Sequence, residues 1–278
     1  MAKHQPAEQA SGAVDIHPTA LVAEGTRIGA GSRIGAFCHI GPHVEIGPES
    51  VLHSHVVVAG RTRIGPKAEL FPFACVGHAP QDLKYKGEPS EVIIGARCRI
   101  RENVTINPGT TGGGMVTSVG DDCLIMAGAH IAHDCKIGNH VILVNNAILG
   151  GHVEVGDHAI LGGGSGVHQF VRIGAHAMIG GMSGVEQDVI PFGTVMGERA
   201  HLAGLNLVGL KRRGFDRDAI HELQKAYRML FGEEGTFQER LAHAVEEFGA
   251  NALVNEVLGF ISAQSDRGLC QPKVARGS

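Results

Sequence analysis

Aliphatic residues recur at every sixth position over most of this 278-residue chain. A step of six meets an aliphatic side chain each time from residue 16 to residue 76, and again, after an interruption, from 94 to 106. A second interruption shifts the phase by one residue, and the repeat then continues from 119 to 185. A period of six fits neither the 3.6 residues of a helical turn nor the alternation of a simple strand. It predicts short strands joined by turns and stacked as a solenoid.

Three such units, eighteen residues in all, would complete one coil of a triangular prism. Successive coils would pair as parallel strands about 4.8 Å apart, with the aliphatic side chains facing the axis of the prism. Glycine often follows the aliphatic residue, as in "RIGAGSRIG", and the 41 glycines of the chain are consistent with a sharp corner in every unit. We therefore predict an all-β parallel β-helix over residues 15–190.

The six-residue repeat ends after Pro191, and helical patterns replace it. The segments "FDRDAIHELQKAYRMLF" and "TFQERLAHAVEEF" have apolar residues at helical spacing, and Thr236 with Glu239 has the signature of a capping box. A third helix is expected after Asn251. The sequence thus predicts a mobile N-terminal extension at 1–14, the β-helix at 15–190 and a C-terminal helical domain at 191–278.

Composition excludes several classes of protein. Six cysteines are scattered without a CxxC pair, and the N-terminal "MAKHQPAEQASGA" lacks the apolar stretch of a secretory signal. No segment approaches the run of about eighteen apolar residues that crosses a bilayer. The formal net charge of −4 provides no general attraction to nucleic acid. We expect a cytoplasmic protein with no stable membrane insertion and no nucleic-acid partner.

The stretch "IMAGAHIAHDCKIG", residues 125–138, places His130, His133 and Asp134 within five positions. In a prism with eighteen residues per coil, His152 and His168 fall on the same edge in the next two coils. The residues alone leave three interpretations open. These histidines are solvated turn residues, as we expect for most of the 17 in the chain, or they bind zinc, as in the gamma-class carbonic anhydrases, or they form an acid/base site.

The repeat is accompanied by motifs that a generic hexapeptide protein does not require: "AHIAHDC", "GVHQF", "GGMSGVEQDV", the loop "QDLKYKGEP" and "GLKRRGF". Over about residues 14–268 the chain resembles the acyl-[acyl-carrier-protein]:UDP-N-acetylglucosamine O-acyltransferase family of lipid A synthesis. The resemblance implies a left-handed β-helix and a homotrimer with sites shared between neighbouring prisms. It also implies transfer of a 3-hydroxyacyl group from acyl carrier protein to the 3-hydroxyl of UDP-N-acetylglucosamine, without a metal or bound cofactor.

The resemblance assigns three residues to catalysis. His133 matches the family's general base, a role that suits an imidazole because its pKa lies near 7. Asp134 would support the imidazolium; neighbouring strand residues tend to face opposite ways, so strand geometry leaves a direct bond between the two open. Gly151 would supply a backbone N–H to the oxyanion. Cys135 has no evident activating base, and we interpret it as structural.

Further positions match family residues that hold the substrates. The substrate-binding set is Asp82, His130, His152, His168, Gln169, Asn206 and Arg213. Lys84 and Arg212 are expected to contact the carrier protein, because basic side chains attract an acidic partner. Gly181 matches the acyl-length ruler, which suggests an acyl group of about twelve to fourteen carbons. Two positions depart from the family: Val208 stands where an acidic residue is frequent, and Pro108 where a basic one is.

Four rival functions make different predictions. The N-acyltransferase of the same pathway carries an N-terminal nucleotide-binding domain, whereas the repeat here begins near residue 15. A coenzyme A-dependent acetyltransferase of this fold would use acetyl-coenzyme A. A zinc lyase would retain stoichiometric metal after purification, and a non-enzymatic scaffold would bind no substrate.

Overall fold

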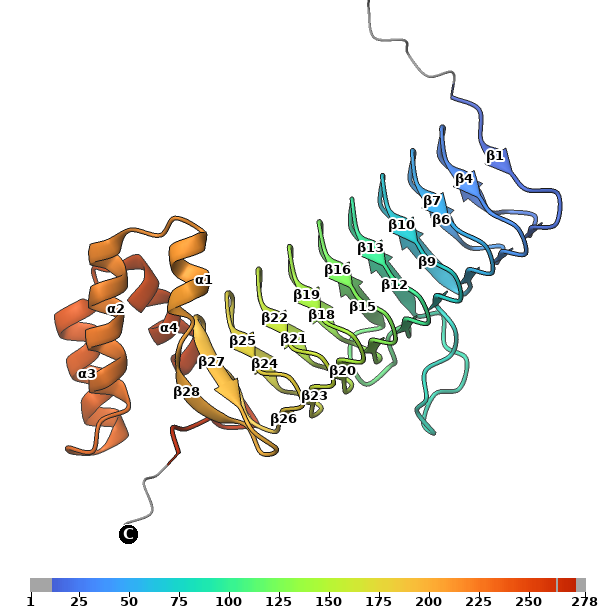
Figure 1. Cartoon of the computed structure of the whole chain (residues 1–278). Helices are drawn as coiled ribbons and strands as arrows, with labels where there is room; N and C mark the ends of the chain where they lie inside the picture. Colours follow the sequence, from blue (N-terminus) through green and yellow to red (C-terminus); the bar gives the residue numbers. More distant parts are fainter. Residues whose placement is uncertain (1–11, 264, 274–278) are drawn as a thin grey trace, which may run out of the picture.

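The computed structural model describes residues 12–263 and 265–273, and these form a long three-sided prism with helices at one end (Figure 1). The extension predicted at 1–14 lies outside the described residues except for 12–14. The repeat forms two-residue and four-residue strands, which belong to three parallel sheets that we call sheets A, B and C.

Each sheet takes every third strand of the repeat. Sheet A contains β1 (Asp15–Ile16), β4 (Arg33–Ile34), β7 (Val51–Leu52), β10 (Glu69–Leu70), β13 (Arg99–Ile100), β16 (Leu124–Ile125), β19 (Ile142–Leu143), β22 (Ile160–Leu161) and β25 (Met178–Ile179). Sheet B contains β2 (Leu21–Val22), β5 (His39–Ile40), β8 (Val57–Val58), β11 (Cys75–Val76), β14 (Thr105–Ile106), β17 (His130–Ile131), β20 (Ile148–Leu149), β23 (Gly166–Val167) and β26 (Gly184–Val185). Sheet C contains β3 (Arg27–Ile28), β6 (Glu45–Ile46), β9 (Arg61–Ile64), β12 (Glu91–Ile94), β15 (Val116–Val119), β18 (Lys136–Ile137), β21 (Glu154–Val155) and β24 (Arg172–Ile173).

The predicted stacking of residues eighteen apart is confirmed. Ile131 pairs with Leu149 on the next coil, and Leu149 pairs with Val167 on the one after. The three side chains are buried in the prism core. The second residue of each two-residue strand points inward, so the first residue points outward. The aliphatic residue of the six-residue repeat is therefore the one that fills the core.

The glycines have a different role from the one predicted. At most corners a left-handed residue lies three positions after the aliphatic one, and it is usually not glycine, as in Asp134 with φ 60° and His152 with φ 62°. Glycine directly after the aliphatic residue permits close approach between coils instead. A Cβ on Gly156, for example, would lie 2.5 Å from the backbone nitrogen of Ala175 on the next coil.

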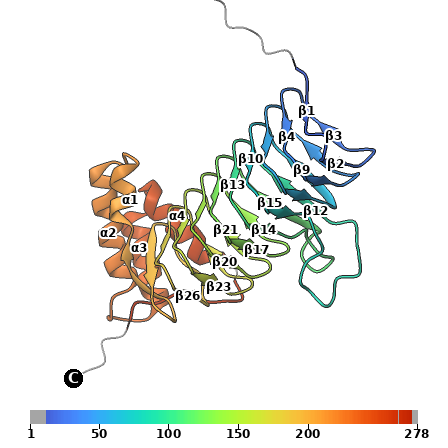
Figure 2. The ribbon, with the colours of Figure 1, turned by 45° about the vertical axis from the view of Figure 1, so that its right-hand side comes forward.

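The two interruptions of the repeat are insertions at one corner of the prism. Residues 77–90 follow β11 of sheet B and lead into β12 of sheet C, and residues 107–115 join β14 to β15 in the same way. We call this the B–C corner, and the other two the C–A and A–B corners. The first insertion projects from the side of the prism (Figure 2). Both insertions therefore enlarge the corner that carries His133.

A hairpin and four helices follow the repeat. The hairpin strands are β27 (Gly193–Met196) and β28 (His201–Leu205), and the helices are α1 (Leu207–Arg212), α2 (Arg217–Leu230), α3 (Phe237–Phe248) and α4 (Ala252–Ser262). The capping box of Thr236 and Glu239 is present at α3. The hairpin and α1 were not predicted, because they are too short to show a period. Within the described residues, no helix is long and apolar enough to cross a membrane.

The chain returns to the prism after α4. Residues 265–273, which we call the return segment, form parallel bridges from Leu269 to Asp188 and from Pro272 to Leu202. The Asp188 carboxylate is buried and accepts a hydrogen bond from Arg172 Nε at 2.8 Å. Arg172 also lies over the Phe260 ring of α4, 4.5 Å from its centroid. These contacts fasten the helical part of the chain to the last coils.

Three histidines form a stack at the C–A corner. The His140 and His158 rings have centroids 4.6 Å apart, and those of His158 and His176 are 4.8 Å apart. Burial, followed by the nearby charge of Arg213, lowers the pKa of His176 from its usual 6.5 to about 4. The Nδ1 atom of His176 is buried without a hydrogen-bond partner among the described residues. Protonating this ring in the folded protein is therefore unfavourable.

This stack predicts a loss of stability in acid. Between pH 6.5 and 4 the unfolded chain binds a proton at His176 that the folded chain does not, so the free energy of unfolding falls as the pH is lowered through that window. We expect His176→Phe to reduce the pH dependence of the melting temperature between pH 7 and pH 4.5, because Phe170 and Phe192 already occupy equivalent left-handed corner positions. His55→Phe, in an exposed corner stack, is the control and should leave that dependence unchanged. Equal slopes in the wild type and the His176 variant would contradict the prediction.

Candidate active site

His133 and Asp134 are hydrogen-bonded to each other, a contact that the prediction from strand alternation left open. The distance from His133 Nδ1 to Asp134 Oδ2 is 2.8 Å. The prediction assumed strand geometry, but both residues lie in the turn after β17, and Asp134 has a left-handed backbone with φ 60°. In that conformation successive side chains no longer alternate across a sheet. The Asp134 carboxylate therefore fixes the orientation of the His133 ring.

The Asp134 side chain is fully buried and held by three donors. Its Oδ1 accepts from the Thr110 backbone N–H at 2.9 Å, and its Oδ2 accepts from the Thr110 hydroxyl at 2.6 Å as well as from His133. The backbone N–H of Asp134 donates to the Thr117 hydroxyl at 2.8 Å. This network leaves the carboxylate no freedom to turn away from the imidazole.

The glycines of the second insertion are required by its close contact with the Asp134 carboxylate. A Cβ on Gly113 would overlap the Asp134 carboxyl group, and one on Gly109 would lie 2.8 Å from Asp134 Oδ1. Only glycine lets the loop fold over Asp134 and bring the Thr110 donors to it. The glycine-rich "NPGTTGGGM" is therefore part of the site and not merely a gap in the repeat.

Three rings follow one another along the B–C corner, those of His133, His152 and Phe170. The His133 and His152 rings meet edge to face with centroids 5.0 Å apart, and His152 stacks on Phe170 at 4.3 Å. Burial lowers the pKa of His152, and burial followed by the charge of His133 lowers that of His130. The Nδ1 atom of His130 lies 2.7 Å from the Thr105 hydroxyl. The lowered pKa values favour the neutral form of both neighbouring rings.

Gly151 lies directly against the imidazole of His133. A Cβ at this position would lie 2.5 Å from His133 Cε1, so any larger residue would displace the ring. No acceptor among the described residues takes the Gly151 backbone N–H, although the next turn donates from Phe170 N to the Gly151 carbonyl at 3.1 Å. A free N–H beside a base is the arrangement that an oxyanion requires.

His133 and His152 are among the histidines that were considered as zinc ligands from the sequence. Ligand atoms of His133, Asp134 and His152 lie within 4.8 Å of one another. However, Asp134 Oδ2 already accepts hydrogen bonds from Thr110 and His133, and a zinc ion would have to displace both. The geometry fits a carboxylate that orients a histidine better than a tetrahedral metal site.

Similar proteins are found over nearly the whole chain. The family model for domain 2 of UDP-N-acetylglucosamine O-acyltransferase matches residues 188–270, and the bacterial transferase hexapeptide model matches 16–60 and 117–151. The acyl-[acyl-carrier-protein]–UDP-N-acetylglucosamine O-acyltransferase of Caulobacter vibrioides is 53% identical over 260 residues, which is 94% of this chain and 99% of that protein. The chain belongs to the UDP-N-acetylglucosamine O-acyltransferase family.

Solved structures of the UDP-N-acetylglucosamine O-acyltransferase family agree with this assignment. The UDP-N-acetylglucosamine acyltransferase of Campylobacter jejuni has a TM-score of 0.88 and 39% identity, covering 93% of this chain and 100% of its own. The Acinetobacter baumannii protein has a TM-score of 0.86 and 40% identity, covering 92% and 99%. The predicted left-handed β-helix is confirmed by these neighbours and by the hexapeptide repeats.

Within the single chain, the site residues predicted for this O-acyltransferase lie at three different corners. The B–C corner brings together the largest group: Asp82, His130, His133, Asp134, Gly151, His152, His168 and Gln169. Asn206, Arg212 and Arg213 lie at α1, next to the C–A corner, and Gly181 lies at the A–B corner. His168 and Gln169 are exposed, and His168 Nδ1 is 3.2 Å from the Gln169 carbonyl.

The polar atoms of Asn206 and Arg213 already hold α1 against the prism. Asn206 Oδ1 accepts from the Gly209 N–H at 3.0 Å, and its Nδ2 donates to the His176 carbonyl at 2.9 Å. Arg213 Nη2 donates to the His158 carbonyl at 2.9 Å, and burial lowers the pKa of Arg213. Arg212 and Val208 are exposed beside them. Asn206 and Arg213 thus have a structural role that the sequence did not indicate.

The first insertion carries Asp82 and Lys84 beside the site. The Asp82 carboxylate accepts from the Lys84 backbone N–H at 2.9 Å, and the Lys84 side chain is exposed. Glu88 Oε1 accepts from Thr111 N at 3.3 Å, which joins the two insertions. Pro108 is buried in the second insertion. At this position the loop therefore presents a packed proline and no basic side chain.

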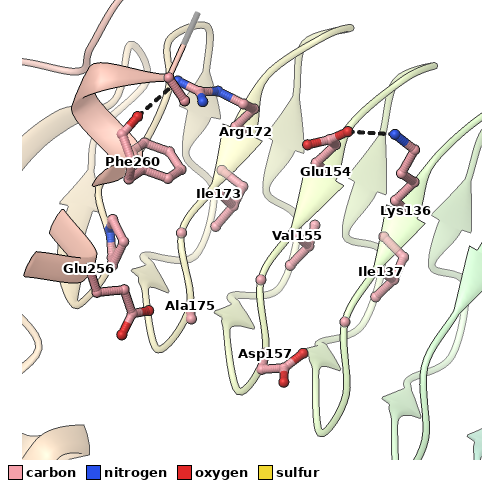
Figure 3. Close-up of a pocket in the computed structure, with 15 residues that line it drawn as sticks. Lys136, Ile137, Glu154, Val155, Asp157, Arg172, Ile173, Ala175, Glu256 and Phe260 are labelled. Atoms are coloured by element: carbon pink, nitrogen blue, oxygen red, sulfur yellow. Dashed lines mark hydrogen bonds and ion pairs between the residues drawn. The ribbon is translucent and has the colours of Figure 1, made fainter. Parts of the chain in front are cut away.

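An open cleft of about 430 Å³ lies at the B–C corner, lined among others by Asp134, His152, Phe170, Ser265 and Asp266. It shares Lys136, Glu154 and Arg172 with a groove of about 520 Å³ between sheet C and α4. Figure 3 shows this groove, with the Lys136–Glu154 ion pair on one side and Phe260 and Glu256 of α4 on the other. The catalytic corner thus opens onto the outer face of sheet C.

The sequence interpretation missed three residues of the site. Thr110 and Thr117 hold Asp134, and Phe170 stacks on His152. Phe170 stands within the "GVHQF" motif and could have been found there, whereas no sequence signal connects Thr110 with Asp134. That contact depends on how an irregular loop folds.

Proposed function

We propose that this chain transfers a 3-hydroxyacyl group from acyl carrier protein to the 3-hydroxyl of UDP-N-acetylglucosamine, the first step of lipid A synthesis, with His133 as general base. The observation that carries the proposal is the 2.8 Å hydrogen bond from His133 Nδ1 to the buried Asp134, with Gly151 packed against the same ring. The names of the relatives at 46% to 56% identity support the donor and the acceptor.

The geometry suggests a direct transfer. With Nδ1–H donating to Asp134, His133 presents Nε2 as the proton acceptor for the sugar hydroxyl. The oxygen then forms its bond to the thioester carbonyl carbon, and the Gly151 N–H stabilises the oxyanion. Collapse of this intermediate breaks the carbon–sulfur bond, and the leaving thiolate takes the proton from the imidazolium. Asp134 stabilises the cation between the two proton transfers.

Cys135 is unsuited to hold an acyl group. Burial raises the pKa of its thiol to about 12, and the thiol donates to the Gly150 carbonyl at 3.2 Å. A neutral, buried thiol is a poor nucleophile. This supports the proposal that the reaction has no covalent acyl-enzyme.

The outer faces of the sheets support a homotrimer. Sheet A presents an apolar row of Leu124, Ile142, Ile160 and Met178, and sheet B presents Ile148, which is 51% exposed. Sheet C instead carries ion pairs such as Lys136 with Glu154. We infer that sheet A of one copy packs on sheet B of the next. That packing would bring the C–A corner with Asn206 and Arg213 to the B–C corner with His133 in the neighbouring copy.

The proposed partners and compartment follow from the same reaction. The exposed side chains of Lys84 and Arg212 are expected to attract an acidic carrier protein. No cofactor enters the proposed steps, and cytoplasmic location remains a prediction.

The direct test is an assay of the purified chain in metal chelator with UDP-N-acetylglucosamine and a set of 3-hydroxyacyl carrier proteins. We expect acylated sugar nucleotide, detected by mass, from a narrow range of chain lengths. Acetyl-coenzyme A is the control donor and should give no product. Absence of product with every acyl carrier protein, or activity that requires added zinc, would contradict the proposal.

The same assay tests Gly181 as the acyl-length ruler. Gly181 is exposed, and a Cβ there would meet only the Gly163 carbonyl oxygen at 3.3 Å and its nitrogen at 3.9 Å. A longer side chain can therefore be accommodated, and we expect Gly181→Met to shift the preferred donor to a shorter acyl chain. Gly259→Met, at an exposed position of α4 where a Cβ meets nothing within 4 Å, tests whether any added side chain has this effect. An unchanged chain-length preference in Gly181→Met would remove Gly181 from this role.

A further inference from the structure

Most corners of the prism carry a backbone hydrogen bond to the preceding coil. The left-handed residue donates its N–H to the carbonyl nineteen positions earlier, as in His152 to His133 at 3.0 Å and Phe170 to Gly151 at 3.1 Å. Asp188 stands three residues after Val185, at the equivalent place in the next coil, but its backbone is not left-handed and its N–H does not bond to the Gln169 carbonyl. Its N–H donates to Gly268 of the return segment instead, at 2.8 Å.

The Gln169 carbonyl has a replacement partner. The Arg267 Nε atom donates to it at 2.7 Å. Leu269 bridges Asp188, and the Cys270 N–H donates to the Asp188 carbonyl at 2.8 Å, so the return segment is paired to the prism beside this contact. The return segment thus takes the place of a further coil at the B–C corner.

This corner is the one that supports the catalytic histidine. The turn containing Gln169 also presents Phe170, whose ring is stacked on His152 with an angle of 5° between the planes. His152 in turn meets His133 edge to face. Phe170 is 44% exposed, so side chains of the following coil do not hold its ring in place. The contact of Arg267 with Gln169 supports this turn where Asp188 of the next coil does not bond to it.

We propose that Arg267 is a positioning residue of the acyl transfer, which holds the turn of Gln169 and Phe170 and so keeps His152 and His133 in register. Ser265 and Asp266, next to it, line the cleft with His152 and Phe170, so the return segment is also a wall of the site. The inference rests on the proposed function, because it assigns Arg267 a role in the same reaction.

The test compares Arg267→Ala, Arg267→Lys and a control, Arg199→Ala, in the full-length protein. The Arg199 side chain is 87% exposed and lies 3.8 Å from Glu186. We expect Arg267→Ala to lower kcat/KM about tenfold or more, since small displacements of a base are costly to the rate. Arg267→Lys should recover part of the loss, because lysine retains one donor, and Arg199→Ala should match the wild type. Melting temperatures report whether the fold is kept.

A double-mutant cycle with Phe170→Leu separates positioning from general stability. If Arg267 acts through Phe170, the loss in the double variant is smaller than the product of the two single losses. Independent losses, or full activity in Arg267→Ala, would overturn the inference. A loss of rate that only accompanies a fall in melting temperature and is not recovered by lysine would also overturn it.

A measurement without turnover keeps this inference separate from the proposed function. Labelled-histidine NMR should show the imidazole signals of His133 and His152 shifted in Arg267→Ala and unchanged in Arg199→Ala. If the wild type transfers no acyl group, the proposed function fails, and these signals alone decide whether Arg267 positions the rings. Unshifted signals would overturn the inference.

Discussion

The His133→Ala variant is expected to lose about 10² to 10⁴-fold in kcat, the range for removing a general base. The sugar hydroxyl is a weak nucleophile at neutral pH, and in this structure His133 is the imidazole bonded to the buried Asp134. His152 contacts it but has its pKa lowered by burial, so it is a poor substitute. The measurement is the initial rate of acylated sugar nucleotide formation at saturating substrates.

The control for this variant is His39→Ala. His39 is an exposed outward residue of β5, in the same sheet but far along the prism, and its removal should not change the rate. The melting temperature of both variants should remain close to that of the wild type, because neither ring fills the prism core. Undiminished turnover in His133→Ala would leave the family assignment intact but remove His133 from the centre of the reaction.

The Asp134→Asn variant is expected to lose activity on a similar scale, about 10² to 10⁴-fold, although it changes only one atom. The Thr110 backbone N–H donates to Oδ1, so the amide oxygen will face that N–H, and the NH₂ group will replace Oδ2, which faces His133 and the Thr110 hydroxyl. His133 Nδ1 must then accept a hydrogen bond, which moves the ring proton to Nε2. The tautomer that can accept the proton of the substrate is lost, as in Ser-His-Asp enzymes.

Asp122→Asn is a matched control for this substitution. Asp122 also has a left-handed backbone, with φ 57°, but its carboxylate pairs with Arg97 at the surface. It should retain wild-type kcat, whereas Asp134→Asn should not. The assay is the same as for His133→Ala, with circular dichroism to confirm that the β-helix is kept. Wild-type activity in Asp134→Asn would show that the carboxylate does not determine which nitrogen of His133 carries the proton.

Much of the architecture was predictable because one residue in six is repeatedly forced into the core. The inward positions of Ile131, Leu149 and Val167 follow from that period alone, and so does the grouping of the histidines at one edge. The irregular parts were less predictable. The hairpin, α1 and the return segment are held by individual contacts such as those of Asn206 and Leu269, which leave no periodic trace.

The candidate site shows the same difference between contacts that follow from the repeat and contacts that depend on irregular segments. The motif pointed to His133, but strand alternation could not establish its bond to Asp134, since Asp134 has a left-handed backbone in the turn after the strand. Thr110 reaches Asp134 across 24 positions through a loop shaped by Gly109 and Gly113. Contacts of this kind depend on the path of a loop, and local residue preferences do not specify that path.

By itself the sequence determined the prism, its parallel coils and the edge on which the histidines lie, because burial of one residue in six is a local and repeated requirement. Only the tertiary structure decided which atoms of that edge meet. The His133–Asp134 bond, the Thr110 donors and the Arg267 contact with Gln169 each join segments whose distance in space is set by turns, insertions and the end of the repeat. Hydrogen bonds need placement within a few tenths of an ångström, and that precision comes from packing of the whole chain.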